Sequence, residues 1–464
     1  MSLLNFFILI MCLFIASGDC FTNVYPKIKQ ENYNGDPGQP LILTPLIEQN
    51  KIEEAQNASQ VHFNGFKNVT SYAGYFTVNK QFNSNMFFWF FPSLNNYKQD
   101  PVILWLQGGP GATSLIGLFA ENGPFKPKSK HGLKLRRHAW TNTHSVIYID
   151  NPVGTGYSFT NGGYAKNETA VGNDLYEALV QFFQLFPKLQ NNKFFIAGES
   201  YAGKYVPAIG YTIHKNNPTA KVKINLSGLS IGNGFCDPEN QVYYDDYLYQ
   251  LGLIDLNSKI QLRKIEEQGL NYIKNKQWYL AFKTFDDLID GDISGHSSLF
   301  KNITGFDNYY NYLNANNTDD KFIYMGKYIQ QADIRRAIHV GNTTFNDINQ
   351  MVEINLIEDA FQSVTPWISE LLNHYRILFY NGQLDIIVAY PLTINFLQNL
   401  KFSAAEEYKT AKRRLWFVDG VLAGYEKHAG NLTEVLVRNA GHMVPADQPK
   451  WALDLITRFT HYKV

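Results

Sequence analysis

Residues 194–207, Phe-Phe-Ile-Ala-Gly-Glu-Ser-Tyr-Ala-Gly-Lys-Tyr-Val-Pro, decide the fold of this chain. Four apolar residues lead into Gly-Glu-Ser-Tyr-Ala, which predicts a buried strand that turns sharply into a helix. A serine at the tip of such a turn exposes its Oγ at the end of the sheet. Small residues are needed two positions before and after it, because strand and helix approach closely there. Gly198 and Ala202 fill these positions, so Ser200 is a candidate nucleophile; the alternative is a tight turn with an incidental serine.

Short apolar runs elsewhere in the chain predict further strands. A strand that is apolar throughout is typical of a parallel sheet covered on both faces, and two aromatic-rich runs near the start suit paired antiparallel strands. Strands that alternate with helices predict an α/β fold with a mostly parallel central sheet flanked by helices. The expected strands are residues 72–78, 86–91, 101–106, 145–150, 194–198, 223–231, 375–380, 414–418 and 434–438, and the expected helices are 170–186 and 448–461.

The segment 236–347 interrupts this pattern. It is rich in Tyr, Asn, Asp and Lys, has helical stretches at 256–268 and 276–289, and contains no apolar strand run. Because the sheet pattern resumes afterwards, we expect an inserted, mostly helical cap that shapes the site, rather than a separate domain. The predicted organisation is a signal peptide (1–18), an N-terminal arm (19–55), the first part of the core (56–235), the cap (236–347) and the second part of the core (348–464).

Composition and the first residues bear on the class of protein and its location. The chain has 464 residues, is 45% apolar and 18% charged, and carries no net formal charge, which gives no indication of nucleic acid or an anionic membrane as a partner. Residues 3–15 are almost wholly apolar and precede Ala16-Ser17-Gly18, a pattern typical of a signal peptide cleaved after Gly18. The run is short for a membrane anchor, which is the alternative. We expect a protein of the secretory pathway, secreted or lysosomal, with no membrane anchor after cleavage.

Glycosylation motifs and cysteine content also bear on the expected secretory location. Asn-x-Ser/Thr motifs behind a signal peptide predict glycosylation, although Asn225 lies in an apolar run and is expected to be inaccessible. Cys12 leaves with the signal peptide, and Cys20 and Cys236 either pair or stay free, so we expect no disulfide framework. The predicted glycosylation sites are Asn57, Asn68, Asn167, Asn302, Asn316, Asn342 and Asn431.

Three polar residues follow three separate predicted strands: Ser200, Asp385 and His442. Catalytic groups of open α/β sheets gather at the carboxyl ends of the strands, and the order Ser, Asp, His is that of an α/β-hydrolase. His442 would take the Ser200 proton, and Asp385 would fix the His442 tautomer and stabilise the imidazolium. Two other acids fit less well, because Asp150 precedes the serine and Glu199 points away along the turn.

Only one of the eleven histidines lies in a Gly-His loop directly after a predicted strand, and it is His442. His339 follows an apolar, helix-like run, and His428 lies in a Gly-flanked loop. We expect both of these to be structural.

A glycine-rich loop, Gln107–Gly111, follows the strand at 101–106. Such a loop exposes backbone N–H groups that can bind a developing oxyanion, although a plain glycine turn is the alternative. We expect the oxyanion donors to be the N–H of Tyr201, directly after the nucleophile, and an N–H from the Gly108-Gly109 pair, that of Gly109.

Several blocks of the sequence resemble the serine carboxypeptidase family and span nearly all of the mature chain. Blocks of this kind in one fixed order are highly specific. Within the family, the chain is most similar to the vitellogenic carboxypeptidase-like group, including venom serine carboxypeptidases, and Gln107, residues 341–347 and residues 381–388 carry that closer likeness. The matching blocks are residues 105–111, 150–158, 198–203, 381–385 and 441–445.

The resemblance implies that the protein releases single amino acids from the C-termini of peptides and proteins through an acyl-enzyme. It also implies that an amide and two glutamates bind the terminal carboxylate of the substrate. Two close carboxyl groups cannot both ionise cheaply, so one keeps a proton and donates it to the substrate. Raising the pH would ionise the pair and repel substrate, so we expect activity to favour acid. The implied substrate-binding positions are Gln107, Gly108, Glu121, Glu199 and Met443.

The chain departs from the family pattern in three respects. Gln107 stands where most of the family has Asn, which makes the carboxylate clamp a methylene longer. Ala112 and Thr113 replace the usual Cys-Ser, and the family's disulfide cysteines are absent. The first departure bears on specificity and the others on stability, and none removes a triad member.

Two other interpretations remain. A non-catalytic partner or stabilising protein could use the same fold, although an intact triad argues against it. An acyltransferase would share the triad and differ only in which nucleophile takes the acyl group. We expect the partner to be a peptide or protein substrate, and the chain is compatible with a homodimer. We expect neither a cofactor nor a metal ion.

Overall fold

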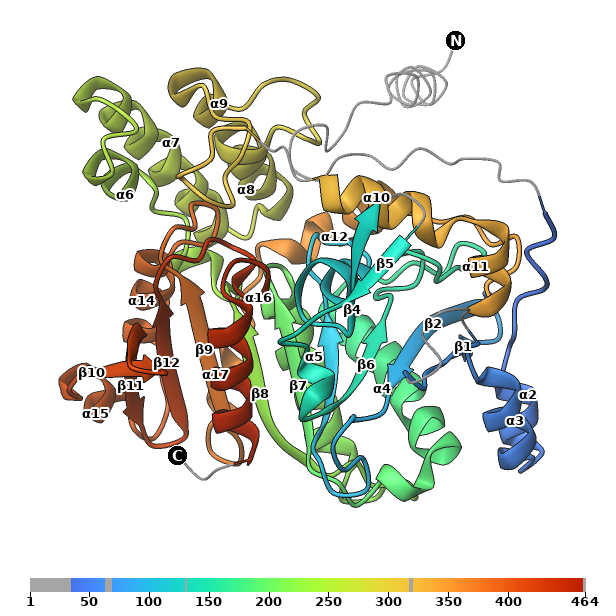
Figure 1. The fold of residues 1–464 in the computed structure, drawn as a ribbon. Helices are drawn as coiled ribbons and strands as arrows, with labels where there is room; N and C mark the ends of the chain where they lie inside the picture. The colour runs from blue at the N-terminus through green and yellow to red at the C-terminus, as the bar shows by residue number, and fades with distance from the viewer. Residues whose placement is uncertain (1–34, 63–68, 130–131, 317–319, 462–464) are drawn as a thin grey trace, which may run out of the picture.

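The computed structural model describes residues 35–62, 69–129, 132–316 and 320–461 (Figure 1). The predicted signal peptide and the first part of the predicted arm, residues 19–34, lie outside the described residues. Across these described ranges, every helix is too short or too polar to cross a bilayer.

A ten-stranded sheet forms the centre of the molecule (Figure 1). From β6 to β12 the neighbouring strands pair in parallel, whereas the two strands at each edge pair antiparallel. This arrangement confirms the predicted α/β fold. In spatial order the strands are β1 (Tyr72–Asn79), β2 (Ser84–Phe91), β6 (Ser145–Ile149), β3 (Val102–Leu106), β7 (Phe194–Glu199), β8 (Leu226–Gly232), β9 (Arg376–Gly382), β12 (Leu432–Val437), β11 (Val421–Ala429) and β10 (Arg414–Val418).

Helices cover both faces of this sheet (Figure 1). Phe194 of β7 contacts Phe183 of α4, while the next residue, Phe195, contacts Phe459 of α17. Successive residues of a strand point to opposite faces, so β7 lies between these two helices, which explains why its sequence is apolar throughout. The flanking helices are α4 (Glu168–Leu185), α5 (Ala202–Asn216), which packs beside α4, and α17 (Pro449–His461).

The α-helices within residues 236–347 form two groups (Figure 1). The first group, α6 to α9 with the short turn η5, stands beyond the ends of β8 and β9. The second group, α10 and α11, lies over other parts of the core, with α10 against β4 (Phe125–Ser129). The segment predicted as one cap therefore covers the core in two places. The bounds are α6 (Asp245–Gln250), α7 (Leu256–Lys274), α8 (Trp278–Phe285), η5 (Asp286–Asp290), α9 (Leu299–Thr304), α10 (Asp320–Ile329), α11 (Ala332–Ala337), α12 (Gln350–Ala360) and α13 (Thr365–Leu371).

The end of the predicted arm packs into the core. Leu43 and Ile47 are buried, and the Leu43 N–H donates to the Tyr75 carbonyl at 2.9 Å. The sequence analysis did not expect this, although residues 41–43 and 46–47 are apolar, because polar and Pro/Gly-punctuated sequence surrounds them. This part of the chain forms α2 (Thr44–Glu48) and α3 (Ile52–Ser59).

Three strands were not predicted: β11 and the hairpin of β4 (Phe125–Ser129) and β5 (Gly132–Leu135). β11 carries the polar run Glu426, Lys427 and His428 and gains its order from pairing with β10 and β12. The expectation that His428 lies in a loop was therefore wrong. The remaining elements are η1 (Gly117–Glu121), η2 (Trp140–Asn142), η3 (Pro187–Leu189), η4 (Pro238–Asn240), α14 (Tyr390–Asn399), α15 (Ala405–Thr410) and α16 (Val444–Asp447).

The asparagines of the glycosylation motifs that the structure describes are exposed, and Asn68 lies outside the described residues. Asn225 is exposed as well, so the expectation that it is inaccessible was wrong, although its Nδ2 donates to the carbonyls of Asn191 and Asn192. Cys236 is a buried free thiol whose Sγ donates to the Gly203 carbonyl at 3.0 Å, while Cys20 lies outside the described residues. The exposed predicted sites are Asn57, Asn167, Asn302, Asn316, Asn342 and Asn431.

Candidate active site

Ser200 occupies the turn between β7 and α5. Its φ is +64°, a left-handed conformation that strains a residue with a side chain, as a nucleophile at the tip of a strand-to-helix turn requires. A Cβ added to Gly198 would lie 2.7 Å from Ala202 Cβ and 2.8 Å from the Leu106 carbonyl oxygen. The close approach predicted for this turn is therefore present, and it demands the small residues found there.

The glycine loop after β3 lies directly against this turn. A Cβ on Gly108 would come within 2.5 Å of Tyr201 N and 2.8 Å of Ser200 Cβ. Gly109, Ser200 and Tyr201 line one cavity. Among the described residues, no hydrogen bond is formed by the N–H of Gly109 or of Tyr201. Both predicted oxyanion donors are therefore available to a ligand beside the serine.

His442 and Asp385 form a buried pair at the carboxyl ends of the strands. Nδ1 of His442 lies 2.9 Å from Oδ2 of Asp385, and both side chains are 0% exposed. Tyr310 stacks on the His442 imidazole with 4.9 Å between ring centroids and 15° between planes, and its carbonyl accepts the His442 N–H at 2.7 Å. Nε2 of His442 has no hydrogen-bond partner in the described structure. With Nδ1 committed to the carboxylate, Nε2 is the nitrogen that can accept a proton.

Asp385 is itself held by donors from two elements. Asn233 Nδ2 donates to Asp385 Oδ2 at 2.7 Å, and the backbone N–H groups of Ile387 and Val388 donate to the two carboxylate oxygens at 3.1 and 3.3 Å. These bonds fix the direction of the Asp385 carboxylate. The sequence analysis missed both Asn233 and Tyr310. The Gly-Asn-Gly sequence at the end of β8 was the signal available for Asn233, whereas Tyr310 had none.

The three predicted carboxylate-binding residues come together next to β3 and β7. Trp105 Nε1 donates to Gln107 Oε1 at 3.1 Å, which turns the Gln107 amide so that Nε2 donates to Glu199 Oε1 at 3.2 Å. Glu121, from η1, is within hydrogen-bonding reach of Glu199. Gln107 is 1% exposed and both glutamates are 0% exposed.

This cluster is short of hydrogen-bond donors. Both Glu121 oxygens and Glu199 Oε2 receive no N–H or O–H in the described structure. Burial raises the pKa of Glu121 to about 7, although the nearby Glu199 and Gln107 side chains work against this shift. Burial, and then the neighbouring Glu121 charge, raises the pKa of Glu199 well above its usual value. The pair therefore holds a proton at acid and neutral pH, and that proton is the donor the two carboxyl groups can share.

The rival acids and histidines have structural partners. Asp150 accepts hydrogen bonds from the Thr113 hydroxyl at 2.6 Å and the Tyr157 N–H at 2.8 Å, so the departure at Thr113 ties the glycine loop to β6. His339 bonds through Nε2 to the Gln60 carbonyl, and His428 bonds through Nδ1 to a threonine hydroxyl on β12. Met443 follows His442 at intermediate exposure and is not among the described residues that line the Ser200 cavity.

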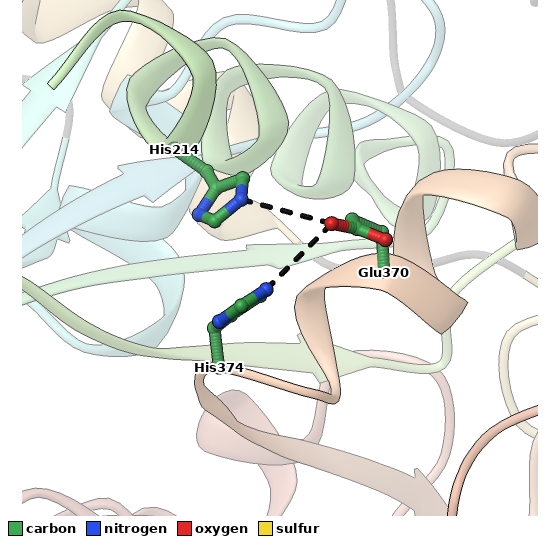
Figure 2. Close-up of side chains that lie close together, drawn as sticks. All are labelled: His214, Glu370 and His374. Atoms are coloured by element: carbon green, nitrogen blue, oxygen red, sulfur yellow. Dashed lines mark ion pairs between the residues drawn. The ribbon is translucent and has the colours of Figure 1, made fainter. Parts of the chain in front are cut away.

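One group of side chains in the described part of the chain is close enough to share a metal ion, and it lies outside this site. It consists of His214, Glu370 and His374 (Figure 2). Ser200 and the unbonded N–H groups of Gly109 and Tyr201 share one cavity, and the His442–Asp385 pair leaves Nε2 of His442 unbonded in the described structure.

A serine at a strained strand-to-helix turn, a buried His–Asp pair and free backbone N–H groups, all at the carboxyl ends of a mostly parallel sheet, define an α/β-hydrolase. The serine carboxypeptidase family model matches residues 61–462. The chain belongs to this family, and it is a serine-type carboxypeptidase by class.

Full-length relatives agree with this assignment. The chain is 58% identical over 454 residues to the venom serine carboxypeptidase of Apis mellifera, covering 97% of each chain. It is 47% identical over 466 residues to the probable serine carboxypeptidase CPVL of Homo sapiens, covering 98% of this chain and 97% of the relative. These relatives confirm the predicted subgroup.

A solved structure shows the same fold. It is the prohormone-processing carboxypeptidase Kex1(delta)p of Saccharomyces cerevisiae, with a TM-score of 0.74 at 23% identity, covering 88% of this chain and 96% of that chain.

Proposed function

We propose that Ser200, His442 and Asp385 form the catalytic triad, and that Gln107, Glu121 and Glu199 hold the free carboxylate of the substrate so that one amino acid is released at a time. The buried Glu121–Glu199 pair beside the nucleophile turn carries this proposal. Two carboxyl groups that keep a proton in the interior can donate it to a third carboxylate. An endopeptidase has no use for such a group, whereas a carboxypeptidase must recognise the chain end.

The first half-reaction forms an acyl-enzyme. His442 Nε2 takes the proton of Ser200 Oγ as this oxygen attacks the carbonyl carbon of the last peptide bond. The N–H groups of Gly109 and Tyr201 bind the oxyanion, and Asp385 stabilises the imidazolium. His442 then returns the proton to the leaving nitrogen, the C–N bond breaks, and the terminal amino acid departs.

The second half-reaction restores the enzyme. A water molecule occupies the vacated place and loses a proton to His442 Nε2 as it attacks the ester carbonyl. The same N–H groups bind the second oxyanion. His442 gives the proton to Ser200 Oγ, the ester bond breaks, and the shortened peptide leaves.

We also infer that the protein works in the secretory pathway, either secreted or in an acidic compartment. The apolar segment at residues 3–15 and the exposed glycosylation motifs support this location. A carboxylate site that needs a retained proton is suited to acid.

The proposed function is tested by incubating the purified protein with one unblocked peptide from acid to neutral pH and reading the products by mass. We expect a ladder that loses one residue at a time from the C-terminus, strongest in acid, and no ladder from Ser200→Ala. Internal cleavage, or a ladder that persists in Ser200→Ala, would contradict it. Transfer of the acyl group to an added amine in place of water would instead favour the acyltransferase interpretation.

A further inference from the structure

The cavity beside Ser200 has an acidic wall that the mechanism leaves unused. Asp286, Asp290, Asp292 and Glu353 line this cavity together with Ser200. The three aspartates come from η5 and the turn after it, and Glu353 comes from α12. Lys, Arg and His are absent from the cavity lining in the described part of the chain. The carboxyl groups therefore face a substrate site without a cation of the protein among them.

Among the acidic residues of this wall, Glu353 gives the strongest indication of a ligand site. It is 4% exposed, and its Oε2 has no hydrogen-bond partner in the described structure. Asp286 is different, because its two oxygens accept backbone N–H groups at 3.1 and 2.8 Å, and Asp290 accepts the Tyr309 hydroxyl at 2.7 Å. A buried carboxylate oxygen without a donor is costly. A group that enters the cavity could supply the donor that this oxygen lacks.

The rest of the cavity is aromatic and apolar. Phe235, Phe282, Phe285 and Phe361 line it. The space not filled by atoms is about 750 Å³, a figure that includes space open to solvent. Apolar walls around a carboxylate group suit a long aliphatic stem with a positive end. Lys and Arg side chains have this form.

A metal ion fits this wall poorly. Among the described residues, no three of these carboxyl groups have ligand atoms that all lie within 4.8 Å of one another. Carboxylates spread over a longer distance suit an elongated organic cation better than one small ion.

The residues that line the Ser200 cavity also indicate which part of the substrate would occupy it. Gly109, Ser200 and Tyr201 line the cavity, whereas Gln107, Glu121 and Glu199 do not. If the second group holds the carboxylate of the departing residue, the cavity lies on the other side of the scissile bond. Its occupant is then the side chain of the penultimate residue, whose carbonyl carbon is attacked.

We propose that this cavity selects substrates with Lys or Arg at the penultimate position, and that Glu353 and Asp290 are the residues that bind the cationic group. The proposal rests on the carboxypeptidase function proposed above. Burial raises the pKa of Asp290 to about 7 and that of Glu353 well above its usual value. The carboxyl groups of this cavity therefore hold protons in acid, and a bound cation would displace these protons by stabilising the ionised carboxylates.

The test compares two unblocked peptides that differ only at the penultimate residue, Arg in one and Met in the other. We expect kcat/KM to be at least about tenfold higher for the Arg peptide, and this ratio to fall about tenfold in Glu353→Gln. Asp287→Asn is the matched control, because Asp287 pairs with Lys283 on the outer side of η5 and should keep the wild-type ratio.

The ratio is informative even if a variant folds poorly, because both peptides meet the same preparation. Asp290→Asn provides a second variant that should lower the ratio in the same direction. A wild-type ratio near one, or a ratio that neither substitution changes, overturns the proposal. If neither peptide loses its last residue, the proposed function has failed instead.

A second and independent observation concerns the surface group His214, Glu370 and His374 (Figure 2). Glu370 Oε1 lies 3.8 Å from His214 Nε2 and 3.6 Å from His374 Nε2, and the ligand atoms of all three lie within 4.8 Å of one another. The Tyr375 hydroxyl lies 3.2 Å from His214 Nδ1, which leaves Nε2 facing the carboxylate. The alternative is a simple ion pair between Glu370 and a protonated imidazole.

We infer that this group binds one Zn²⁺-like divalent transition-metal ion, with water completing the coordination. Two imidazoles and a carboxylate suit zinc, and a fixed Nδ1 contact orients a ligating histidine. The ion would join the end of α5 to the turn between α13 and β9.

Zinc titration followed by calorimetry and thermal unfolding at pH 7.5 tests this site. We expect one equivalent of Zn²⁺ to bind and to raise Tm, with both effects lost in His374→Ala and Glu370→Gln. His296→Ala is the matched control, because His296 is an exposed histidine that also lies near a carboxylate. Binding that is absent, or equal in all four proteins, overturns the inference.

Discussion

Asp385→Asn should lower kcat by about 10³–10⁴-fold while leaving the fold intact. The neutral amide cannot stabilise the imidazolium that forms when His442 takes the Ser200 proton. The amide of the substituted side chain also has no favourable orientation. Asp385 Oδ2 accepts from Asn233, Val388 and His442, and Oδ1 accepts from Ile387, so either position of an amide NH₂ faces a donor. Steady-state kinetics on one unblocked peptide measures the loss.

Asp246→Asn is the control for this chemical change. Asp246 is 65% exposed and pairs with Lys259 and Arg263 on the surface of the cap. Its substitution should leave kcat within about twofold. If Asp385→Asn kept more than about a tenth of the activity, the His442–Asp385 pair would not be part of the reaction.

The second large effect is the loss of activity with rising pH. Burial raises the pKa of Glu121 to about 7, and burial together with the Glu121 charge raises the pKa of Glu199 well above its usual value. The pair therefore holds protons below pH 7 and begins to lose them as the pH rises through about 7. Each ionisation places a charge beside the substrate carboxylate. We expect kcat/KM for an unblocked peptide to fall about tenfold per pH unit above pH 7.

The direction of this pH dependence distinguishes an effect of the carboxyl pair from an effect of the triad. A histidine base becomes more active as the pH rises and it loses its proton, so His442 alone predicts the opposite slope. A peptide amidated at its C-terminus carries no terminal charge and should not show the fall above pH 7. Glu199→Gln should flatten the fall for the unblocked peptide, because the amide donates a hydrogen bond at every pH. If kcat/KM for the amidated peptide fell by the same amount above pH 7, ionisation of the carboxyl pair would not be the cause.

Several features of this site were predictable from the sequence because their signals are local. The apolar strand before Ser200 and the small residues around it are enforced within one turn, and the structure shows the same close approach. The predicted Asp385–His442 pair could be inferred from two strand ends, since parallel strands bring their carboxyl ends to one edge. The order of the three residues then defined the fold class.

Other features depend on contacts between distant segments and had no local signal. The polar strand β11 exists because β10 and β12 pair with it. Tyr310 stacks on His442 from a cap segment that precedes it by more than a hundred residues. The Trp105 indole decides which way the Gln107 amide faces.

The sequence by itself determined the α/β fold, the family and the candidate nucleophile, because strand, turn and helix preferences act between near neighbours. Only the tertiary structure decided which side chains share a space: Asn233 with Asp385, Glu353 with the η5 aspartates, and His214 with Glu370 and His374. Such sets are brought together by packing between elements, and their charges, burial and missing donors exist only after the chain has folded.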